Sequence, residues 1–387
     1  MVVRIGSEEK GDCLVEVEPG RDGLTVETKN KDLLEEGIRT VVGEAVSTLG
    51  VDASVRTVET GALDYVIVAR VEAAVRAAAP DRATPIVPSV DRDASERDRP
   101  RRSRLYAPGN RPRLLAGIEV HGADCVLLDL EDAVPLAEKP AARILVKHLL
   151  ATVRFPDEVW VRINPLDAGG RDDVEEILLG RPHGICLPKA ESAADVRALS
   201  ELLRRVESNR GVDEGGTWIL PILETAAGVL HAEEIASADP RVVALAFGAE
   251  DYTRDVGARR RWDALLYARS RIVAAAASAG IQASDTVFAD LDDAAGLEEE
   301  CVRARDLGFD GKGAINPRQL PAIHRAFSPT EDEIEYARRV VAAAEEAEAN
   351  GAGAVALDGR MVDRPVLERA RRTIKYAGRL VGRGEER

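Results

Sequence analysis

Two carboxylates come shortly after neighbouring apolar runs of the sequence, in a pattern suited to a divalent cation. Glu224 follows the run 218–223, and Asp251 follows the run 242–247. Two carboxylates at adjacent strand ends can hold one Mg²⁺ through oxygen atoms and leave positions open for water and substrate. A chelated 2-hydroxy acid or 2-keto acid would fill those positions, and the ion would stabilise an alkoxide as it becomes a carbonyl. The pair predicts a Mg²⁺-dependent enzyme that breaks a carbon–carbon bond.

A positive charge is then required for the second fragment of the substrate, which leaves as an enolate. Arg162 lies near the end of the apolar run 159–163 and keeps its charge at any physiological pH. It can neutralise the enolate or the thioester oxygen from which the enolate forms. An acid/base group must also protonate the carbon atom of that fragment.

The elements that must position these groups have the pattern of repeated βα units. From Arg104 onward, short apolar runs alternate with amphipathic stretches, which is typical of a parallel sheet. Eight such units over this length predict a closed (β/α)₈ TIM barrel, whose chemistry lies at the carboxyl ends of the strands. The expected strands are 105–107, 125–130, 159–163, 184–187, 218–223, 242–247, 283–288 and 313–315.

Polar side chains follow nearly every one of these strands, so we expect them to meet at one mouth of the barrel. A single such residue could be a helix N-cap or a surface charge, but several carboxylates and two cations together indicate an active site. The residues that support the three named above are Glu131, Asp132, Asn164 and Lys189, with Asn110, Glu250, Asp290 and Asn316 at other strand ends.

The segments on either side of the barrel predict further units. The N-terminal residues have the pattern of a small α+β domain, with strands at 13–17, 24–28 and 54–58 and helices at 33–49 and 63–79. A Pro- and Arg-rich stretch without apolar periodicity follows and predicts a linker that acts as a solvated tether. The C-terminal part predicts a helical lid with a Gly-rich loop at 351–363. The expected boundaries are 1–88 for the α+β domain, 89–103 for the linker, 104–328 for the barrel and 329–387 for the lid extension.

The composition limits the class of protein. A formal net charge of -15 disfavours binding to nucleic acid or to an anionic membrane, because both need a contiguous cationic surface. Glu8 and Glu9 interrupt the N-terminus before a signal peptide could form, and no apolar run reaches membrane-spanning length, so we expect a cytoplasmic protein. The four cysteines form no Cys-x-x-Cys pair and are expected to be buried, reduced thiols.

Residues 102–379 resemble the citrate lyase beta subunit and its relatives, the malyl-CoA and citramalyl-CoA lyases of the HpcH/HpaI aldolase superfamily. The segments that carry the resemblance are Arg104-Leu-Tyr-Ala-Pro-Gly-Asn110, Leu127-Leu-Asp-Leu-Glu-Asp-Ala133, Val161-Arg-Ile-Asn-Pro165, Leu187-Pro-Lys189, Ile222-Leu-Glu-Thr-Ala226, Phe247-Gly-Ala-Glu-Asp-Tyr252, Gly311-Lys-Gly-Ala-Ile-Asn-Pro317 and Gly359-Arg-Met-Val-Asp-Arg-Pro365.

This resemblance implies a role for particular residues. It makes Glu224 and Asp251 the Mg²⁺ ligands and Arg162 a substrate-binding residue. It adds Asp363 as the acid/base, supplied by a neighbouring subunit of a homotrimer. For coenzyme A, the resemblance implies contacts from Tyr106, Arg113, Ile315 and Asn316.

Residues 1–88 resemble the citrate lyase acyl carrier (gamma) subunit, chiefly through the stretch from Thr60 to Ala74. In the carrier, a serine in a Glu-Ser-Gly-Asp stretch bears the prosthetic arm, but this sequence has Lys10 there, between Glu9 and Gly11. Lysine cannot form the phosphodiester. Either the domain serves assembly or channelling and the lyase uses free coenzyme A thioesters, or Ser7 is modified instead. Partner subunits of the citrate lyase type are compatible with both alternatives.

The sequence therefore predicts a lyase that splits a hydroxyacyl thioester, with citryl as the favoured acyl group. A citramalyl-CoA or malyl-CoA lyase is the alternative within the same chemistry, because only a few small contacts would separate these substrates. Thioester hydrolysis after condensation, as in a malate synthase, is a second enzyme alternative. A non-catalytic scaffold subunit is the alternative from another class.

Overall fold

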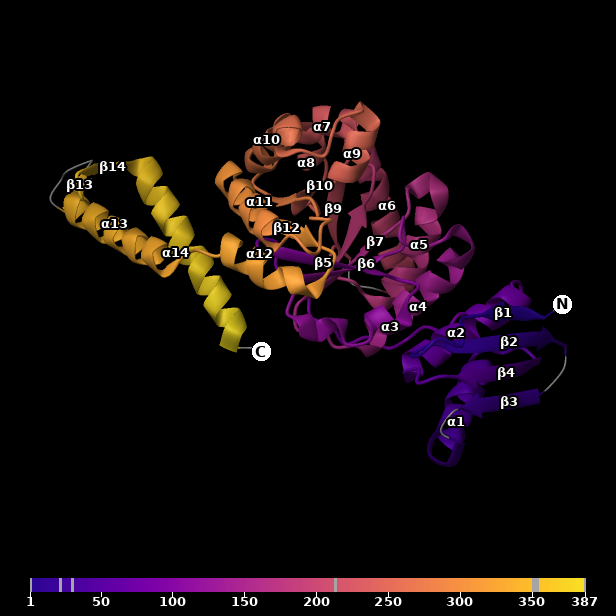
Figure 1. The fold of residues 1–387 in the computed structure, drawn as a ribbon. Helices are drawn as coiled ribbons and strands as arrows, with labels where there is room; N and C mark the ends of the chain where they lie inside the picture. Colours follow the sequence, from indigo (N-terminus) through magenta and orange to yellow (C-terminus); the bar gives the residue numbers. More distant parts are fainter. Residues whose placement is uncertain (1, 21–22, 29–30, 212–213, 350–354, 386–387) are drawn as a thin grey trace.

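Three parts follow one another along the chain in Figure 1: a small N-terminal sheet with its helices, a closed barrel, and a C-terminal arm. The computed structural model describes residues 2–20, 23–28, 31–211, 214–349 and 355–385. The predicted fold class, a (β/α)₈ barrel preceded by a small α+β unit, is confirmed.

The N-terminal sheet contains four strands in the order β1-β2-β4-β3. Buried residues alternate with more exposed ones along β2, where Cys13, Val15 and Val17 face the core, because successive side chains of a strand point to opposite faces. The sequence pattern missed β1, which is only three residues long. The elements are β1 (Val3–Ile5), β2 (Cys13–Pro19), β3 (Gly23–Thr28), α1 (Lys31–Leu49), β4 (Ala53–Glu59) and α2 (Asp64–Ala78).

Eight parallel strands close the barrel in the order β10-β11-β12-β5-β6-β7-β8-β9. Each of the eight expected strands overlaps one observed strand. Inside the barrel, Leu127, Trp160 and Leu220 form a compact core, while a larger core lies between the strands and the surrounding helices. The strands are β5 (Ser103–Pro108), β6 (Cys125–Asp129), β7 (Glu158–Arg162), β8 (Gly184–Leu187), β9 (Trp218–Leu223), β10 (Ala244–Phe247), β11 (Gln282–Asp285) and β12 (Gly311–Ala314).

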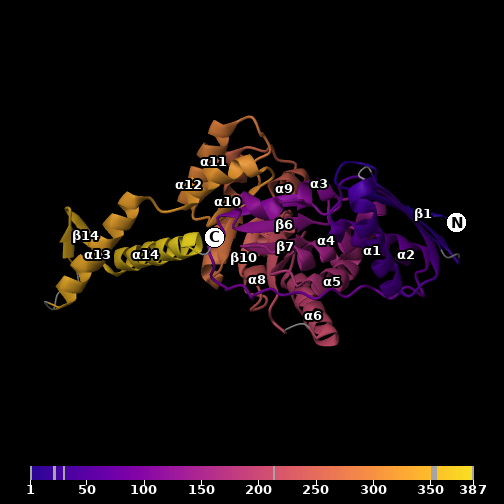
Figure 2. The ribbon, with the colours of Figure 1, turned by 90° about the horizontal axis from the view of Figure 1, so that it is seen from below.

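Helices surround these strands, as the βα repeat requires (Figure 2). All four cysteines are buried and free, as predicted. Among the described residues, no helix is both long enough and apolar enough to cross a membrane. The helices are α3 (Pro112–Leu115), α4 (Lys139–Thr152), α5 (Arg171–Ile177), α6 (Ala193–Arg210), α7 (Ala226–Leu230), α8 (Ala232–Ala236), α9 (Ala249–Val256), α10 (Trp262–Ala279), α11 (Ala294–Leu307) and α12 (Leu320–Phe327).

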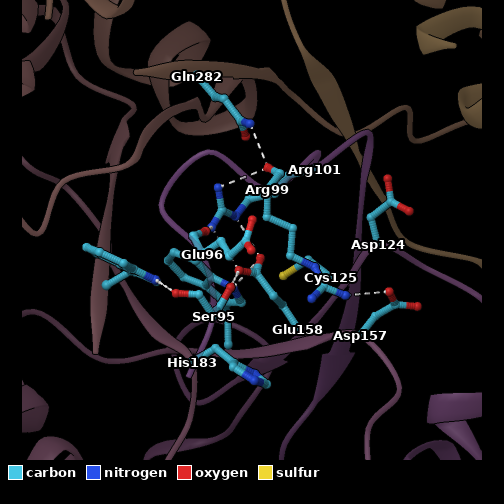
Figure 3. Close-up of polar contacts among 12 residues, drawn as sticks. Ser95, Glu96, Arg99, Arg101, Asp124, Cys125, Asp157, Glu158, His183 and Gln282 are labelled. Atoms are coloured by element: carbon cyan, nitrogen blue, oxygen red, sulfur yellow. Dashed lines mark hydrogen bonds and ion pairs between the residues drawn. The ribbon is translucent and has the colours of Figure 1, made fainter. Parts of the chain in front are cut away.

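The segment that joins the N-terminal unit to the barrel closes the amino-terminal end of the barrel (Figure 3). Arg101 is fully buried and forms a two-pronged ion pair with Glu158, the first residue of β7, at 2.6 and 2.8 Å. Trp218 donates a hydrogen bond to the backbone oxygen of Ser95 at 3.0 Å. The expected solvated tether is therefore wrong. The run of arginines indicated solvation only because its carboxylate partners lie far away in the sequence.

The C-terminal arm consists of two long helices joined by a hairpin. They are α13 (Glu331–Ala349) and α14 (Arg364–Glu385), and the hairpin is β13 (Val355–Leu357) with β14 (Arg360–Val362). The expected loop 351–363 is thus a hairpin from residue 355 onward, and residues 351–354 lie outside the described part. Asp358 and Gly359 form the turn with φ of 50° and 74°, the left-handed conformation that a two-residue hairpin turn requires.

Candidate active site

An arginine and an aspartate at the carboxyl ends of adjacent strands form the centre of the barrel mouth. Arg162 ends β7 and donates two hydrogen bonds to Asp129, at the end of β6, both at 2.7 Å. The burial of Arg162 would lower its pKa, but the hydrogen bonds and charge of Asp129 raise it above the ordinary value. The guanidinium group is therefore a fixed positive charge. Asp129 was not among the residues expected from the sequence, although a charged residue at the end of an apolar strand was a usable signal.

Glu131 connects this pair to the neighbouring strand. Its carboxylate lies 2.9 Å from Nη1 of Arg162 and also pairs with Lys189, which follows β8. Burial raises the pKa of Glu131, and the charge of Arg162 and the hydrogen bond from Lys189 oppose the rise. Asp132 lies further out, with its side chain 58% exposed and 3.8 Å from Arg162. Three of the four expected supporting residues thus meet around the same guanidinium group or next to it.

Glu224 lies at the end of β9 and is buried at the mouth. The backbone N–H of Lys189, in a left-handed turn with φ of 48°, donates a hydrogen bond to its carboxylate at 2.8 Å. Burial and the charge of Glu131, with a further contribution from Asp251, raise the pKa of Glu224 to about 8. The carboxyl group therefore sits where negative charge is in excess and where a cation would be stabilised.

Gly248 makes room for that carboxyl group. It follows β10, and a Cβ atom there would lie 2.5 Å from Oε2 of Glu224 and 2.6 Å from its Cβ. No residue larger than glycine fits without displacing Glu224. The glycine also begins the turn into α9, whose first turn carries Asp251.

Asp251 is near enough for its charge to act on Glu224, which supports the pairing expected from the sequence. Its side chain is 17% exposed and forms an ion pair with Arg254, one turn further along α9. A divalent cation fits this pair in charge and in ligand type, because both residues offer carboxylate oxygens. Among the described residues no group of three or more His, Cys, Asp or Glu side chains gathers for a metal. A cation held by Glu224 and Asp251 would take its other ligands from water and substrate.

The remaining predicted residues have different positions. Tyr106, inside the barrel on β5, stacks its ring beneath Arg162, with 5.7 Å between the guanidinium carbon and the ring centroid. Asn164 is buried, and its amide bonds to Asp173 at 2.6 Å and to the backbone oxygen of Leu130, so it supports the loop after β7.

The residues expected near coenzyme A lie on the rim. Arg113 is exposed on α3, and Ile315 is 41% exposed after β12. The side chain of Asn316 accepts a hydrogen bond from the backbone N–H of Arg318 at 3.0 Å and begins a short 3₁₀ helix. These residues therefore follow strands β5 and β12, which neighbour each other in the barrel.

Asp363 is exposed at the start of α14, where its carboxylate accepts a hydrogen bond from the backbone N–H of Val366 at 3.2 Å. Met361 and Val366 line a cavity together with Gln282, at the amino end of β11. That end is opposite to the mouth that contains Glu224, and Figures 1 and 2 both show the hairpin standing apart from the barrel. One chain alone does not bring Asp363 to the other predicted site residues.

Two family models match the chain. Residues 102–317 match the model described as HpcH/HpaI aldolase/citrate lyase, and residues 2–78 match the model described as malonate decarboxylase delta subunit (MdcD). These matches agree with the two resemblances expected from the sequence motifs.

Individual proteins are similar over the barrel and the arm. Citrate lyase subunit beta of Leuconostoc mesenteroides subsp. cremoris is 44% identical over 284 residues, which are 72% of this chain and 94% of that protein. A (3S)-malyl-CoA thioesterase of Cereibacter sphaeroides is 38% identical over 282 residues, which are 72% of this chain and 95% of that protein. The crystal structure of protein CitE from Mycobacterium tuberculosis in complex with magnesium, acetoacetate and coenzyme A has a TM-score of 0.59 at 36% identity, and the match covers 73% of this chain and 100% of that chain.

Proposed function

This chain belongs to the HpcH/HpaI aldolase/citrate lyase family, and on that basis we propose that it is a Mg²⁺-dependent lyase for hydroxyacyl thioesters. We favour citryl as the acyl group, so that cleavage gives oxaloacetate and an acetyl thioester. The observation that carries the proposal is the set of opposite charges at one barrel mouth. Glu224 and Asp251 offer a cation site, and the fixed positive charge of Arg162 lies beside them.

Glu224 and Asp251 are the residues that would hold Mg²⁺. When bound, the ion supplies Lewis-acid stabilisation for the substrate oxygen at which the new carbonyl forms. The magnesium named for the similar CitE structure supports this assignment. Because the raised pKa of Glu224 favours its protonated form, the proton of Glu224 must leave before both carboxylates can act as ligands.

Arg162 is proposed to bind the thioester fragment. Its position is fixed by two hydrogen bonds to Asp129 and by the ion pair with Glu131, so no reorganisation is needed when charge develops on the substrate. The guanidinium group then stabilises the enolate oxygen as the carbon–carbon bond breaks. The coenzyme A part is proposed to reach the rim near Tyr106, Arg113, Ile315 and Asn316.

Asp363 is proposed to be the acid/base that gives a proton to the carbon of the enolate. Because this aspartate lies on the arm at the other end of its own barrel, we propose that it acts at the mouth of a neighbouring copy. A homotrimer in which each arm reaches the next barrel would provide this arrangement.

A malyl thioester is the second candidate substrate, because a relative at 38% identity is named as a (3S)-malyl-CoA thioesterase. Such an activity would release free coenzyme A, whereas a lyase leaves the thioester bond of the acetyl product intact. Citramalyl-CoA remains a third substrate with the same chemistry.

The deciding experiment measures keto acid and free coenzyme A from citryl-, citramalyl- and malyl-CoA, with and without Mg²⁺. We expect Mg²⁺-dependent release of oxaloacetate from citryl-CoA without free coenzyme A. Release of pyruvate or glyoxylate would assign a different acyl group, and free coenzyme A would indicate hydrolysis. No turnover of any thioester would contradict the proposal and favour a scaffold.

Two substitutions separate the proposed roles. Asp363→Ala should abolish turnover while Mg²⁺ binding persists, because the aspartate lies outside the cation site. Glu224→Ala should abolish both, because it removes a ligand. Calorimetric titration with Mg²⁺ beside the thioester assay tests the difference, and unchanged activity in either variant would contradict the assignment.

A further inference from the structure

Helix α2 belongs to two hydrophobic cores at once, which fixes the N-terminal unit to the barrel. One face of the helix packs against the barrel helices, chiefly α4, and the other packs under the N-terminal sheet (Figure 1). Separation of the two parts would expose the first face to water. The residues on the barrel face are Tyr65, Val66, Ala69 and Ala73, and those on the sheet face are Ile67, Val71, Ala74 and Val75.

Buried charges reinforce this interface. Glu72 of α2 is fully buried and bonds to Lys147 at 2.7 Å and to His148 at 2.5 Å, both on α4. Lys147 also bonds to Glu176 at 2.7 Å, which pairs with Arg76 of α2 at 2.8 Å. Detachment of the unit would break the bonds from Glu72 to Lys147 and His148 and from Arg76 to Glu176. These contacts dock the N-terminal unit against the barrel, and a mobile carrier would have to break them.

The fixed position brings the loop before β2 to the rim of the barrel mouth. Arg70 of α2 binds Asp12 in that loop at 2.9 Å, and reaches the backbone oxygen of Asn110, just after β5, at 3.4 Å. A methyl group on Gly11 would lie only 3.8 Å from the Cα of Arg113. The loop and the start of α3 therefore form one continuous surface beside the carboxyl end of β5.

Three cations on this surface are exposed: Lys10, Arg111 and Arg113. In the part of the chain that the structure describes, no carboxylate forms an ion pair with any of them, whereas Arg101, Arg102 and Arg162 are all paired. Glu8 and Glu9 are exposed in the same loop and reduce the positive potential. Unpaired cations at the mouth of a protein with a net charge of -15 are suited to an anionic ligand that enters there.

We propose that the docked N-terminal unit is a wall of the barrel mouth and adds Lys10 to Arg113 as a site for the phosphate groups of a free coenzyme A thioester. The identity of the ligand rests on the proposed function. Lys10 occupies the position at which the carrier has the serine that bears the prosthetic arm. A lysine there cannot bear that arm, but it would attract a free coenzyme A thioester.

Binding of coenzyme A itself, measured by calorimetry at low ionic strength, tests the site without any turnover. Lys10→Gln should weaken binding about threefold and Lys10→Glu about tenfold, whereas Lys10→Arg should preserve it, because exposed charge pairs contribute modestly. Glu8→Gln should tighten binding, and the differences should shrink at high salt. Arg82→Gln is the matched control, because Arg82 is exposed beyond the other end of α2.

Equal affinity for Lys10→Gln, Lys10→Glu and the unsubstituted protein would overturn the phosphate site. Hydrogen exchange on the full chain tests the fixed position: amides of α2 should exchange as slowly as those of α4. Faster hydrogen exchange in α2 while the amides of α4 stay protected would contradict the proposal that the N-terminal unit stays docked as a wall of the mouth. Because neither measurement uses the reaction, a protein that binds coenzyme A but has no lyase activity would still test this inference, whereas no binding of coenzyme A to the unsubstituted protein would contradict the proposed function itself.

Discussion

At the scale of single residues, Glu224 combines two properties that oppose each other. Burial and the charge of Glu131 favour its protonated form, while its proposed role needs the carboxylate. A cation bound by Glu224 would resolve the conflict, because its charge would outweigh the repulsion from the neighbouring carboxylates. This balance would explain how a buried acid without an ion pair among the described residues is kept at the mouth of the barrel.

Gly248 provides a test at this scale. Gly248→Ala adds an atom 2.5 Å from Oε2 of Glu224, so the carboxyl group must move. We expect turnover to fall about 100-fold, as a displacement of about 1 Å can cause, and Mg²⁺ binding to weaken with it. Gly37→Ala in α1 is the control, because a methyl group there meets no atom within 4 Å. Normal turnover in Gly248→Ala would show that Glu224 is not held as described.

The sequence predicted single residues where a polar group follows an apolar run. Glu224, Glu131 and Arg162 were found in this way, and the structure places them at one mouth. Asn164 followed the same rule, yet its side chain bonds to Asp173 and supports a loop. A residue's position after a strand does not reveal where its side chain points, because that side chain can turn towards the mouth or towards the adjoining helix.

At the scale of elements, the segment before β5 contributes to stability through a buried ion pair. Arg101→Ala leaves Glu158 buried without its cation, and we expect the free energy of unfolding to fall by about 3–5 kcal/mol. Denaturant unfolding measures the loss. Arg325→Ala is the control, since its pair with Glu298 is largely exposed and should change stability by about 0.5 kcal/mol or less.

The double variant Arg101→Met with Glu158→Gln refines this test. It removes both charges, so it should be more stable than Arg101→Ala. If the double variant were the less stable of the two, packing of the segment rather than the unpaired charge would explain the loss.

Helices and strands were predicted where apolar residues recur regularly over many positions, and they were missed where the element is short. The helix expected at 63–79 is observed as Asp64–Ala78, because its apolar positions recur over four turns. The hairpin around Asp358 and Gly359 was missed, because each strand has three residues, too few to show alternation. The Asp-Gly pair was the available signal.

At the scale of the whole molecule, the contact between the N-terminal unit and the barrel should depend on pH. Burial would raise the pKa of Glu72, but the hydrogen bond from His148 and the charge of Lys147 lower it from 4.5 to about 2. A carboxyl group whose pKa is lower in the folded protein than in the unfolded chain stabilises the fold at any pH above its unfolded pKa. For Glu72 this stabilisation is lost as the pH falls from about 4.5 towards 2. Burial would also raise the pKa of Glu176, but Arg76 and Lys147 lower it. Protonation of Glu176 at low pH should therefore reduce stability in the same way.

We therefore expect the free energy of unfolding, measured with urea, to fall by up to about 3 kcal/mol through protonation of Glu72 as the pH falls from about 5 to about 2. Glu72→Gln should be less stable at neutral pH and should lack that part of the pH dependence. The same acid sensitivity in the variant and the unsubstituted protein would show that Glu72 is not the group responsible.

Mixed assemblies test whether Asp363 acts on a neighbouring barrel. Glu224→Ala and Asp363→Ala are each expected to be inactive, but each provides what the other lacks. After equal mixing with exchange of subunits, about one mouth in four combines an intact barrel with an intact arm from its neighbour, so about a quarter of the activity should return. Size-exclusion chromatography checks that exchange has occurred. No recovery after proven exchange would contradict action between copies.

The packing between segments that lie far apart in the sequence was the feature least predictable from the sequence. The βα repeat predicted the barrel, because each strand and helix depends on local pattern. The packing of α2 on α4 joins Glu72 to Lys147 and His148, which lie about 75 positions away, and no local pattern encodes such a match. The buried role of Arg101 escaped prediction for the same reason.

The joint between the two parts of this polypeptide is also the floor of the barrel. With Arg101 and Ser95 bound to the first residues of β7 and β9, residues inserted between these two positions would loosen the barrel from below.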